Sequence, residues 1–556
     1  MTDVLNPAAI KPARLTALIT VALWLMVGCN FVRTDAVAAT STTVRVIVAT
    51  NAESPQQIET SSPVPTLNAA ARTMQPISTA TLAATNTPST NMLTEDGCEA
   101  SAGQPGAAHI VTADVDYAAH TVRVDHRVHV INRTNDLLAD VVLNIEPNRW
   151  AGVFMLESVL GTYNGNPFVT AYEATGRRLR VELAAPIEPG CGVELQLVYV
   201  LQIPPVGQGV SSLTGYLGYT ARQLNLGHWL ATIAVRRGSA WVSHDVAQIG
   251  EQIVSETANW DVTFNVANAP VELHIAAPGR LERPDGDTWR FVLIESREFS
   301  ASMSDQFNII AQESTSGTMI EVYTFDDAVI NTANGVIDGA AHVLLIASRS
   351  LSMYSDLFGE YPYERFLIVE GDFSDGMEFS GLVFVGRDWF RTFTGEPTGY
   401  LTIITVHEVA HQWWYARVGS DQAETPWLDE ALATYSEYIF FEEYYPALRD
   451  WWWSFRVGTF VPADFTGRRV NSTVYEFSTI REYINAVYLR GAQMLHALRE
   501  DIGTDPFFNW LHAYSQAGAG RVVSPDVFWS LLTDEQRELT RETREAYLSS
   551  VLAGFP

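Results

Sequence analysis

The first half of the chain alternates apolar and polar residues in short runs. Residues 122–130 place Val122, Val124, His126, Val128 and Val130 on one face, with polar side chains between them. The same two-residue period returns at 179–183 and 193–197, and glycine, proline and asparagine separate the runs. A period of two indicates β-strands with one buried face. We therefore expect an all-β domain over residues 98–310.

Beyond residue 326 the hydrophobic period lengthens to that of helices. The pattern predicts a helix over 336–357, strands at 366–370 and 382–386, and then helices nearly to the end of the chain. A chain of 556 residues is longer than one hydrophobic core usually serves. The expected fold is thus α+β and multidomain, with a mostly α-helical domain over residues 311–556.

The amino-terminal residues have the pattern of an export signal. Lys11 and Arg14 precede an apolar run at 15–27, which is short for a membrane span, and Gly28-Cys29 follows. The end of this segment resembles the lipobox of bacterial lipoproteins, in which the cysteine is lipidated. We expect a signal peptide over residues 1–28, lipidation at Cys29 and a lipid anchor on the outer, extracellular or periplasmic face of a bacterial cell membrane. The alternative is an uncleaved amphiphilic anchor, which also exports the protein.

Residues 29–97 and the cysteines agree with export. The stretch is rich in serine, threonine, alanine and proline and nearly lacks aromatic residues, so we expect a flexible tether. The chain has three cysteines, Cys29, Cys98 and Cys191. With Cys29 lipidated, an even pair remains in an oxidising compartment, which favours a Cys98–Cys191 disulfide over two free thiols.

Charge excludes one class of partner. The formal net charge is −29 at pH 7, whereas a nucleic-acid-binding protein needs a basic face. Acidity on this scale suits cationic ligands such as peptide amino termini, although it also serves solubility. Nothing in the sequence determines the oligomeric state.

The segment from Thr402 to Trp414 contains the pattern H-E-x-x-H. His407 and His411 are four residues apart, so on a helix they project from one face and can both bind Zn²⁺. Glu408 then lies beside the metal, where it can act as a general base. The pattern is short, and the alternative is an amphipathic helix with two surface histidines. Eighteen residues after His411, Glu430 starts a second predicted helix and can supply a third, anionic ligand.

Several further motifs accompany this one in the order found in a known family. They are Phe358-Gly-Glu-Tyr-Pro-Tyr363, Gly376-Met377-Glu378, Trp427-Leu-Asp-Glu430-Ala-Leu-Ala, Val487-Tyr488-Leu-Arg-Gly491-Ala492 and, in the β-rich part, Asn225-Leu-Gly-His-Trp229. Together they resemble the M1 family of zinc metallopeptidases, the gluzincins of the aminopeptidase N and leukotriene A4 hydrolase type, over about residues 98–556. The resemblance implies a saddle-like amino-terminal β domain, a thermolysin-like catalytic domain and, since the chain stops at Pro556, a short form without the large carboxy-terminal helical domain.

The resemblance also implies roles for individual residues. One Zn²⁺ is bound by His407, His411 and Glu430, and Glu408 activates water. Tyr488 stabilises the oxyanion of the transition state. Glu378, on a substrate-binding strand with Gly376 and Met377, pairs with the free amino terminus of a peptide. The expected activity is therefore that of an aminopeptidase acting on peptides.

Two positions depart from the family pattern. Asp375 stands where the first glycine of G-x-M-E-N is usual, and Phe379 replaces the asparagine. A side chain at the first position is expected to narrow or re-aim the substrate strand. An endopeptidase or another zinc hydrolase on the same scaffold therefore remains an alternative. A non-catalytic surface binding module is a third reading, which the combination of base and tyrosine disfavours.

Overall fold

The computed structural model describes residues 106–549, except for 164, 208–214, 285, 287 and 334. All of these belong to one compact unit, residues 45–556. The expected signal peptide (1–28) and tether (29–97), with Cys29 and Cys98, lie outside the described residues. Within them, no helix combines the length and apolar character needed to cross a membrane.

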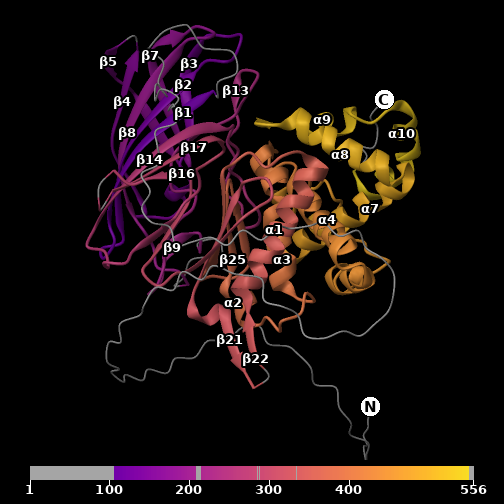
Figure 1. Ribbon diagram of the computed structural model, residues 1–556. Coiled ribbons are helices and arrows are strands. Elements are labelled where there is room, and N and C mark those ends of the chain that lie inside the picture. Colours follow the sequence, from indigo (N-terminus) through magenta and orange to yellow (C-terminus); the bar gives the residue numbers. More distant parts are fainter. Residues whose placement is uncertain are drawn as a thin grey trace, which may run out of the picture. The chain divides into compact units, whose positions relative to one another are not determined.

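The amino-terminal part is built on a sheet of eight strands, in the order β16-β17-β14-β1-β2-β8-β4-β5. The strands are β1 (Ala107–Asp116), β2 (Thr121–Ile131), β4 (Phe154–Tyr163), β5 (Asn166–Val169), β8 (Gly192–Gln202), β14 (Ala258–Ala267), β16 (Arg280–Glu282) and β17 (Thr288–Ser296). Neighbouring strands are antiparallel except β1 and β14, which are parallel. This part is coloured indigo to magenta in Figure 1.

Three smaller sheets complete this part. Their strands are β15 (His274–Ala276), β18 (Ala301–Ser304), β10 (Leu224–Leu226) and β9 (Leu217–Tyr219); β11 (Thr232–Ile233), β3 (Leu138–Asn144), β7 (Arg178–Ile187) and β6 (Tyr172–Thr175); and β12 (Arg236–Arg237) with β13 (Ala240–Trp241). The predicted apolar face of β2 is buried throughout, including His126, whose ring lies 2.8 Å from Nδ1 of His109. Cys191 is buried and disulfide-bonded, with its partner outside the described residues.

A second sheet begins the carboxy-terminal part, with strand order β19-β20-β23-β25-β24. Its members are β19 (Asn308–Glu313), β20 (Met319–Thr324), β23 (Arg365–Gly371), β24 (Gly376–Phe379) and β25 (Leu382–Gly386), and a hairpin of β21 (Val329–Thr332) and β22 (Gly335–Asp338) follows β20. The sheets change between Ser304 and Asn308, so the boundary expected after residue 310 falls inside β19. β24 is an edge strand, because it pairs only with β25 in this sheet.

Helices fill the rest of the chain, orange to yellow in Figure 1. They are α1 (Gly339–Phe358), α2 (Arg387–Arg391), α3 (Tyr400–Ala410), α4 (Trp427–Tyr444), α5 (Arg449–Trp452), α6 (Ile480–Tyr483), α7 (Arg490–Ile502), α8 (Thr504–Gly518), α9 (Pro525–Ser530), α10 (Asp534–Leu539) and α11 (Arg541–Tyr547), with three π-helical turns, η4 (Gln412–Arg417), η6 (Trp453–Gly458) and η8 (Ile484–Leu489). A short parallel pair, β26 (Val418–Gly419) and β27 (Arg521–Val522), links distant helices.

The predicted helix over 336–357 begins three residues later than expected. Val336 and Ile337 pair across the β21–β22 hairpin, and the Asp338 carboxylate accepts a hydrogen bond from the Ala341 amide at 2.9 Å. An aspartate in this position satisfies a free amide of the first turn, so the helix starts after it. The predicted α+β organisation, all-β and then mostly helical, is confirmed.

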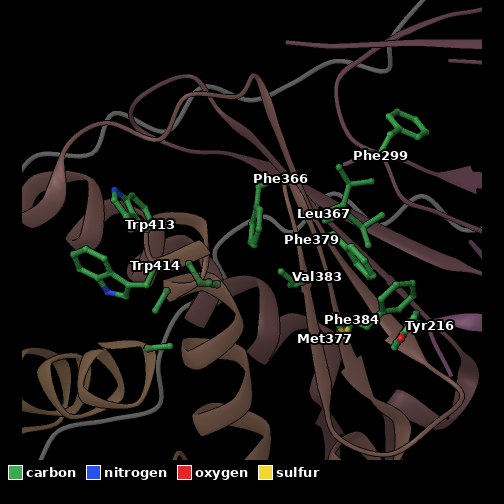
Figure 2. Close-up of a cluster of buried hydrophobic side chains, with 14 of the residues drawn as sticks. Tyr216, Phe299, Phe366, Leu367, Met377, Phe379, Val383, Phe384, Trp413 and Trp414 are labelled. Atoms are coloured by element: carbon green, nitrogen blue, oxygen red, sulfur yellow. The ribbon is translucent and has the colours of Figure 1, made fainter. Parts of the chain in front are cut away.

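Phe379 joins the two sheet systems. Its side chain is fully buried and meets the ring of His228 edge-on at 4.9 Å, and Gly227 leaves no room for a side chain there. Figure 2 shows Phe379 in one cluster with Phe384, Met377 and Tyr216. The residue that replaces the family's asparagine therefore packs into the core between the β-rich part and the second sheet.

A partly buried polar network makes a second connection between these parts. Arg222 of the β-rich part lies 2.9 Å from Asp327 and 2.8 Å from Asp372. The side-chain amide of Gln223 donates to the backbone oxygen of Glu370 at 2.9 Å. The carboxyl group of Glu370 is fully buried, 3.6 Å from Arg222, and accepts a hydrogen bond from the Phe325 amide.

Candidate active site

Helix α3 places three of the predicted site residues together. Every residue of α3 after Tyr400 is buried, as expected for a sequence that is mostly apolar all round, with two threonines, His407 and Glu408 as its polar residues. His407 lies in its last turn and His411 follows its end, with the two ring centroids 4.7 Å apart. At His411 the α-helix changes into the π-helical turn η4.

Helix α4 brings Glu430 to the same point. The helix starts at Trp427 after Pro426, so Glu430 lies in its first turn. The Thr425 side chain does not cap it, but donates to the backbone oxygen of Asp421. Oε2 of Glu430 is 3.2 Å from Nε2 of His407 and 3.6 Å from Nε2 of His411.

These three side chains fit a zinc ion. Their ligand atoms all lie within 4.8 Å of one another, and all three residues are buried. In a tetrahedral site with bonds of about 2.0–2.1 Å, two ligand atoms lie about 3.3–3.4 Å apart, which is close to the two separations above. Two imidazoles and a carboxylate also leave a fourth position for water or substrate. Glu378, Glu408 and His411 form an overlapping cluster, but that set has one histidine only.

Buried carboxylates orient both histidines. Nδ1 of His411 is 2.6 Å from Asp429, and Nδ1 of His407 is 2.9 Å from Glu437. Such contacts fix the ring so that Nε2 faces the metal. Burial raises the pKa of Glu437, but Arg456 at 2.9 Å and His407 outweigh burial, so the pKa is lowered overall. Sequence reasoning missed both carboxylates, although Glu437 follows Glu430 by seven residues, two turns on the same face.

Glu408 has the environment of a base. It is buried, and its Oε2 has no hydrogen-bond partner among the described residues. Burial is the main cause that raises the pKa of Glu408 to about 7. Its Oε1 lies against Gly376 of β24, where any side chain would overlap the carboxylate. The first residue of the predicted substrate strand therefore touches the candidate base directly.

Tyr488 stacks on His407. It belongs to the π-helical turn η8, and its ring is parallel to that of His407, within 5° and with centroids 5.8 Å apart. Its hydroxyl interacts with the Glu430 carboxylate. Burial and the charge of Glu430 raise the pKa of Tyr488 well above its usual value. The phenol consequently stays protonated and can donate a hydrogen bond at the metal-binding point.

A second acidic group accompanies Glu378. The β-rich part contributes Glu251, and Gln422 donates to Glu251 at 3.1 Å and to Glu378 at 3.4 Å. Burial raises the pKa of Glu378 and the charge of Glu251 raises it further, while burial and Asp429 raise the pKa of Glu251. Glu251 lies between β13 and β14, where no motif or period marks it, so sequence reasoning did not find it.

Of the two unusual residues beside the substrate strand, only Asp375 lies at the cavity. Asp375 has φ of 71°, a conformation that favours glycine, and its backbone oxygen accepts a hydrogen bond from the Gly386 amide at 2.6 Å. Asp375 lines the cavity, together with Gly376, Met377 and Glu378. Phe379 does not, because its ring is in the core described above. Of the two positions that depart from the family pattern, only Asp375 can therefore narrow the space along the substrate strand.

The predicted metal ligands, base, tyrosine and substrate strand border one cavity of about 410 Å³. Its wall includes the three candidate metal ligands, Glu408, Tyr488 and Glu378 from the carboxy-terminal part, and Tyr216, Gly250 and Glu251 from the β-rich part. The predicted metal ligands, Glu408, Tyr488 and the strand residues 376–378 are thus brought together, whereas Cys191 does not line this cavity.

The geometry agrees with a comparison against known families. Residues 343–547, from α1 to α11, match the model of the peptidase family M1 domain. This segment is similar to M1 peptidase domains. The predicted resemblance to the M1 family is thereby confirmed. The matched segment includes both helices that carry the candidate zinc ligands, the strand β24 and Tyr488.

Curated relatives of the M1 domain are aminopeptidases by name. Aminopeptidase M1-A of Oryza sativa subsp. japonica is 25% identical over 281 residues, 47% of this chain and 30% of that protein. Endoplasmic reticulum aminopeptidase 1 of Homo sapiens is 27% identical over 241 residues, 41% of this chain and 25% of that protein. The matched segments thus span less than a third of the length of these relatives.

Solved structures extend the likeness to the β-rich part. The M1 zinc metallopeptidase from Deinococcus radiodurans matches with a TM-score of 0.57 and 18% identity, over 82% of this chain and 96% of that chain. At this identity the match shows a shared fold. The fold includes the β-rich part before the M1 domain, because the match covers far more than residues 343–547.

Proposed function

We propose that this protein is a zinc-dependent aminopeptidase that removes residues from the amino termini of peptides. The observation that carries the proposal is the pair Glu378 and Glu251 beside the metal-binding triad, in one cavity. In the described part of the chain, no arginine or lysine nitrogen lies within 4.0 Å of either carboxylate. A substrate ammonium group is the complementary cation, and its charge favours ionisation of both acids.

The zinc is assigned to His407, His411 and Glu430. When bound there, it supplies Lewis acidity that lowers the pKa of a coordinated water and polarises the scissile carbonyl. The carboxylates of Asp429 and Glu437 hold the two imidazoles in the ligating orientation.

Glu408 transfers the proton, and Tyr488 stabilises the negative oxygen. The free Oε2 of Glu408 accepts a proton from the attacking water and later passes it to the leaving amine. The phenol of Tyr488 donates to the oxygen that becomes negative as the carbonyl is attacked, an interaction stronger in the transition state than in the substrate.

The edge position of β24 suits the peptide backbone. An edge strand has unpaired amide and carbonyl groups, to which an extended peptide can add as a further strand. Gly376 and Met377 lie in this strand next to Glu378, at the cavity wall. A substrate whose amino group reaches Glu378 is thereby aligned with its first peptide bond near the metal-binding triad.

The test compares a peptide with a free amino terminus and the same peptide acetylated there. We expect cleavage of the free peptide only, loss of cleavage on chelation, recovery with Zn²⁺, and no cleavage by Glu408→Gln with zinc still bound. Equal cleavage of both peptides would show an endopeptidase. Zinc binding without cleavage of either peptide would favour a binding module. Export and lipid anchoring through Cys29 stay predictions alongside this proposal.

A further inference from the structure

A row of aromatic side chains leads away from the catalytic cavity. Trp389 contacts Tyr400 with ring centroids 4.8 Å apart, Tyr400 contacts Phe455 at 5.2 Å, and Phe455 stacks on Trp451 at 4.9 Å. The four rings come from four elements, α2, α3, η6 and α5. All four side chains are half-buried, so each keeps a face or an edge open. We call these four residues the aromatic ladder.

The ladder is continuous with the site already described. Trp389 and Tyr400 line the same cavity as the candidate zinc ligands and Glu408. The indole nitrogen of Trp389 is buried and has no hydrogen-bond partner among the described residues. A peptide carbonyl passing through the cavity can accept that hydrogen bond, which removes the cost of a buried unpaired donor.

Helix α3 gives the ladder its direction relative to the substrate. Glu378 clusters with His411, at the carboxy-terminal end of α3, whereas Tyr400 is the first residue of the helix. A peptide whose amino group lies at Glu378 therefore extends past Glu408 toward Tyr400. The ladder thus lies on the side of the residues downstream of the scissile bond.

The distances set a peptide length. Tyr400 precedes Glu408 by eight residues, which is about 12 Å along a helix axis, and an extended peptide advances about 3.3 Å per residue. Tyr400 is then level with roughly the third or fourth residue after the scissile bond. The two further rings, at about 5 Å each, add roughly three residues.

We propose that the aromatic ladder binds apolar side chains of the substrate downstream of the scissile bond, so that the enzyme prefers peptides of about seven or more residues with apolar residues in that region. This inference rests on the proposed aminopeptidase function. Partly exposed aromatic rings gain from contact with apolar and aromatic side chains, beyond the gain from the area buried.

The competing arrangement is recognition of a short peptide by its terminal carboxylate. Arg481 also lines the cavity, and its side chain is exposed. If Arg481 binds the terminal carboxylate, dipeptides and tripeptides become the best substrates. The two arrangements therefore predict opposite dependence on length.

The experiment measures kcat/KM of the zinc-loaded full chain on peptides of two to ten residues with identical first and second residues. One series carries leucine or phenylalanine downstream and the other carries serine. We expect kcat/KM to rise at least tenfold between two and eight residues in the apolar series only. In Trp451→Ala and Phe455→Ala this ratio of octapeptide to dipeptide falls toward one, and in Tyr475→Ala, an exposed tyrosine outside the ladder, it stays as in the wild type.

The outcomes separate the two proposals. If dipeptides are hydrolysed and kcat/KM stays constant or falls with peptide length, the ladder proposal is wrong. An equal rise of kcat/KM in the serine series also contradicts it. Neither result contradicts the aminopeptidase proposal. Absence of hydrolysis at every length overturns the aminopeptidase. If an alanine variant fails to fold, Trp451→Leu replaces it in the same length series. In addition, the affinity of an apolar decapeptide is compared between Glu408→Gln and Glu408→Gln combined with Trp451→Leu. A lower affinity in the combined variant supports the ladder, and an equal affinity overturns it.

Discussion

The α-carbon of Gly376 lies directly against the carboxylate of Glu408, so that a methyl group in place of the glycine hydrogen would overlap Oε1 and Cδ. Gly376 belongs to the edge strand β24 and Glu408 to helix α3. The proposed substrate strand and the proposed general base are thus in direct contact. The position of one determines the position of the other.

Gly376→Ala tests this contact. The added methyl group must displace Glu408 or the strand by about 1 Å, and a misplacement of that size costs about a hundredfold in rate. We expect kcat/KM to fall by that order while zinc content and the thermal midpoint stay near wild type. The matched control is Gly399→Ala just before the same helix, where a Cβ meets nothing within 4 Å. Full activity in Gly376→Ala would show that Glu408 moves freely.

Asp429→Asn tests the orientation of His411. The carboxylate lies 2.6 Å from Nδ1 of His411, and the amide has the same shape without the charge. Partners of this kind typically contribute 10–100-fold to metal affinity. We expect zinc affinity, measured by competition with a chelator, to fall by about that factor, and excess zinc to restore part of the activity. Asp450→Asn, at an exposed aspartate, serves as control. An unchanged zinc affinity in Asp429→Asn would contradict the role of Asp429 in orienting His411.

Tyr488→Phe tests the oxyanion contact. The ring remains parallel to His407, and only the hydroxyl is lost. Removing one such donor costs about 10²–10³ in kcat, and we expect KM and zinc content to change little. Tyr483→Phe is the comparison, because its hydroxyl lies beside Gly250 in the same cavity, and its loss in kcat should be much smaller. A change in KM alone would place Tyr488 in substrate binding.

Glu370→Gln tests whether the carboxyl group of Glu370, away from the candidate zinc ligands, makes the free energy of unfolding depend on pH. Burial raises the pKa of Glu370 to about 8 from 4.5 in the unfolded chain. Between these values the folded protein holds a proton that the unfolded chain releases, so stability falls as pH rises from 4.5 to 8. The amide has no such proton. We expect the free energy of unfolding of Glu370→Gln, relative to that of the wild type, to increase over this range by at most about 5 kcal/mol.

The measurement for Glu370 is chemical unfolding at several pH values between 4.5 and 9. Glu364→Gln, at an exposed carboxylate next to the same strand, is measured alongside as the control substitution. A difference for Glu370→Gln that is also constant with pH would mean that this carboxyl group is ionised in the folded protein.

Local patterns carried most of the prediction of the fold. The period of two in β2 and the spacing of His407 and His411 depend only on the geometry of a strand and of a helix. For the same reason, the start of α1 was misplaced by three residues, since a hairpin and a capping aspartate compete with the apolar period there.

Long-range packing explains what the sequence could not show. Glu251 reaches Gln422 from 171 residues away in the chain. Phe379 follows Glu378 in the strand, so its side chain points to the other face. Its large apolar ring is therefore accounted for by the core against Gly227 and His228, and its replacement of asparagine does not alter the cavity wall.

The π-helical turn η8 has a consequence for how the site can vary. A π-turn accommodates one residue more than an α-turn, and each residue of an α-helix rotates the following side chains by about 100°. Deleting a single residue ahead of Tyr488 would restore regular winding and swing the phenol away from His407, although every motif residue would remain in the sequence. The angular phase of the helix, rather than the presence of tyrosine, decides whether the hydroxyl reaches the carbonyl under attack.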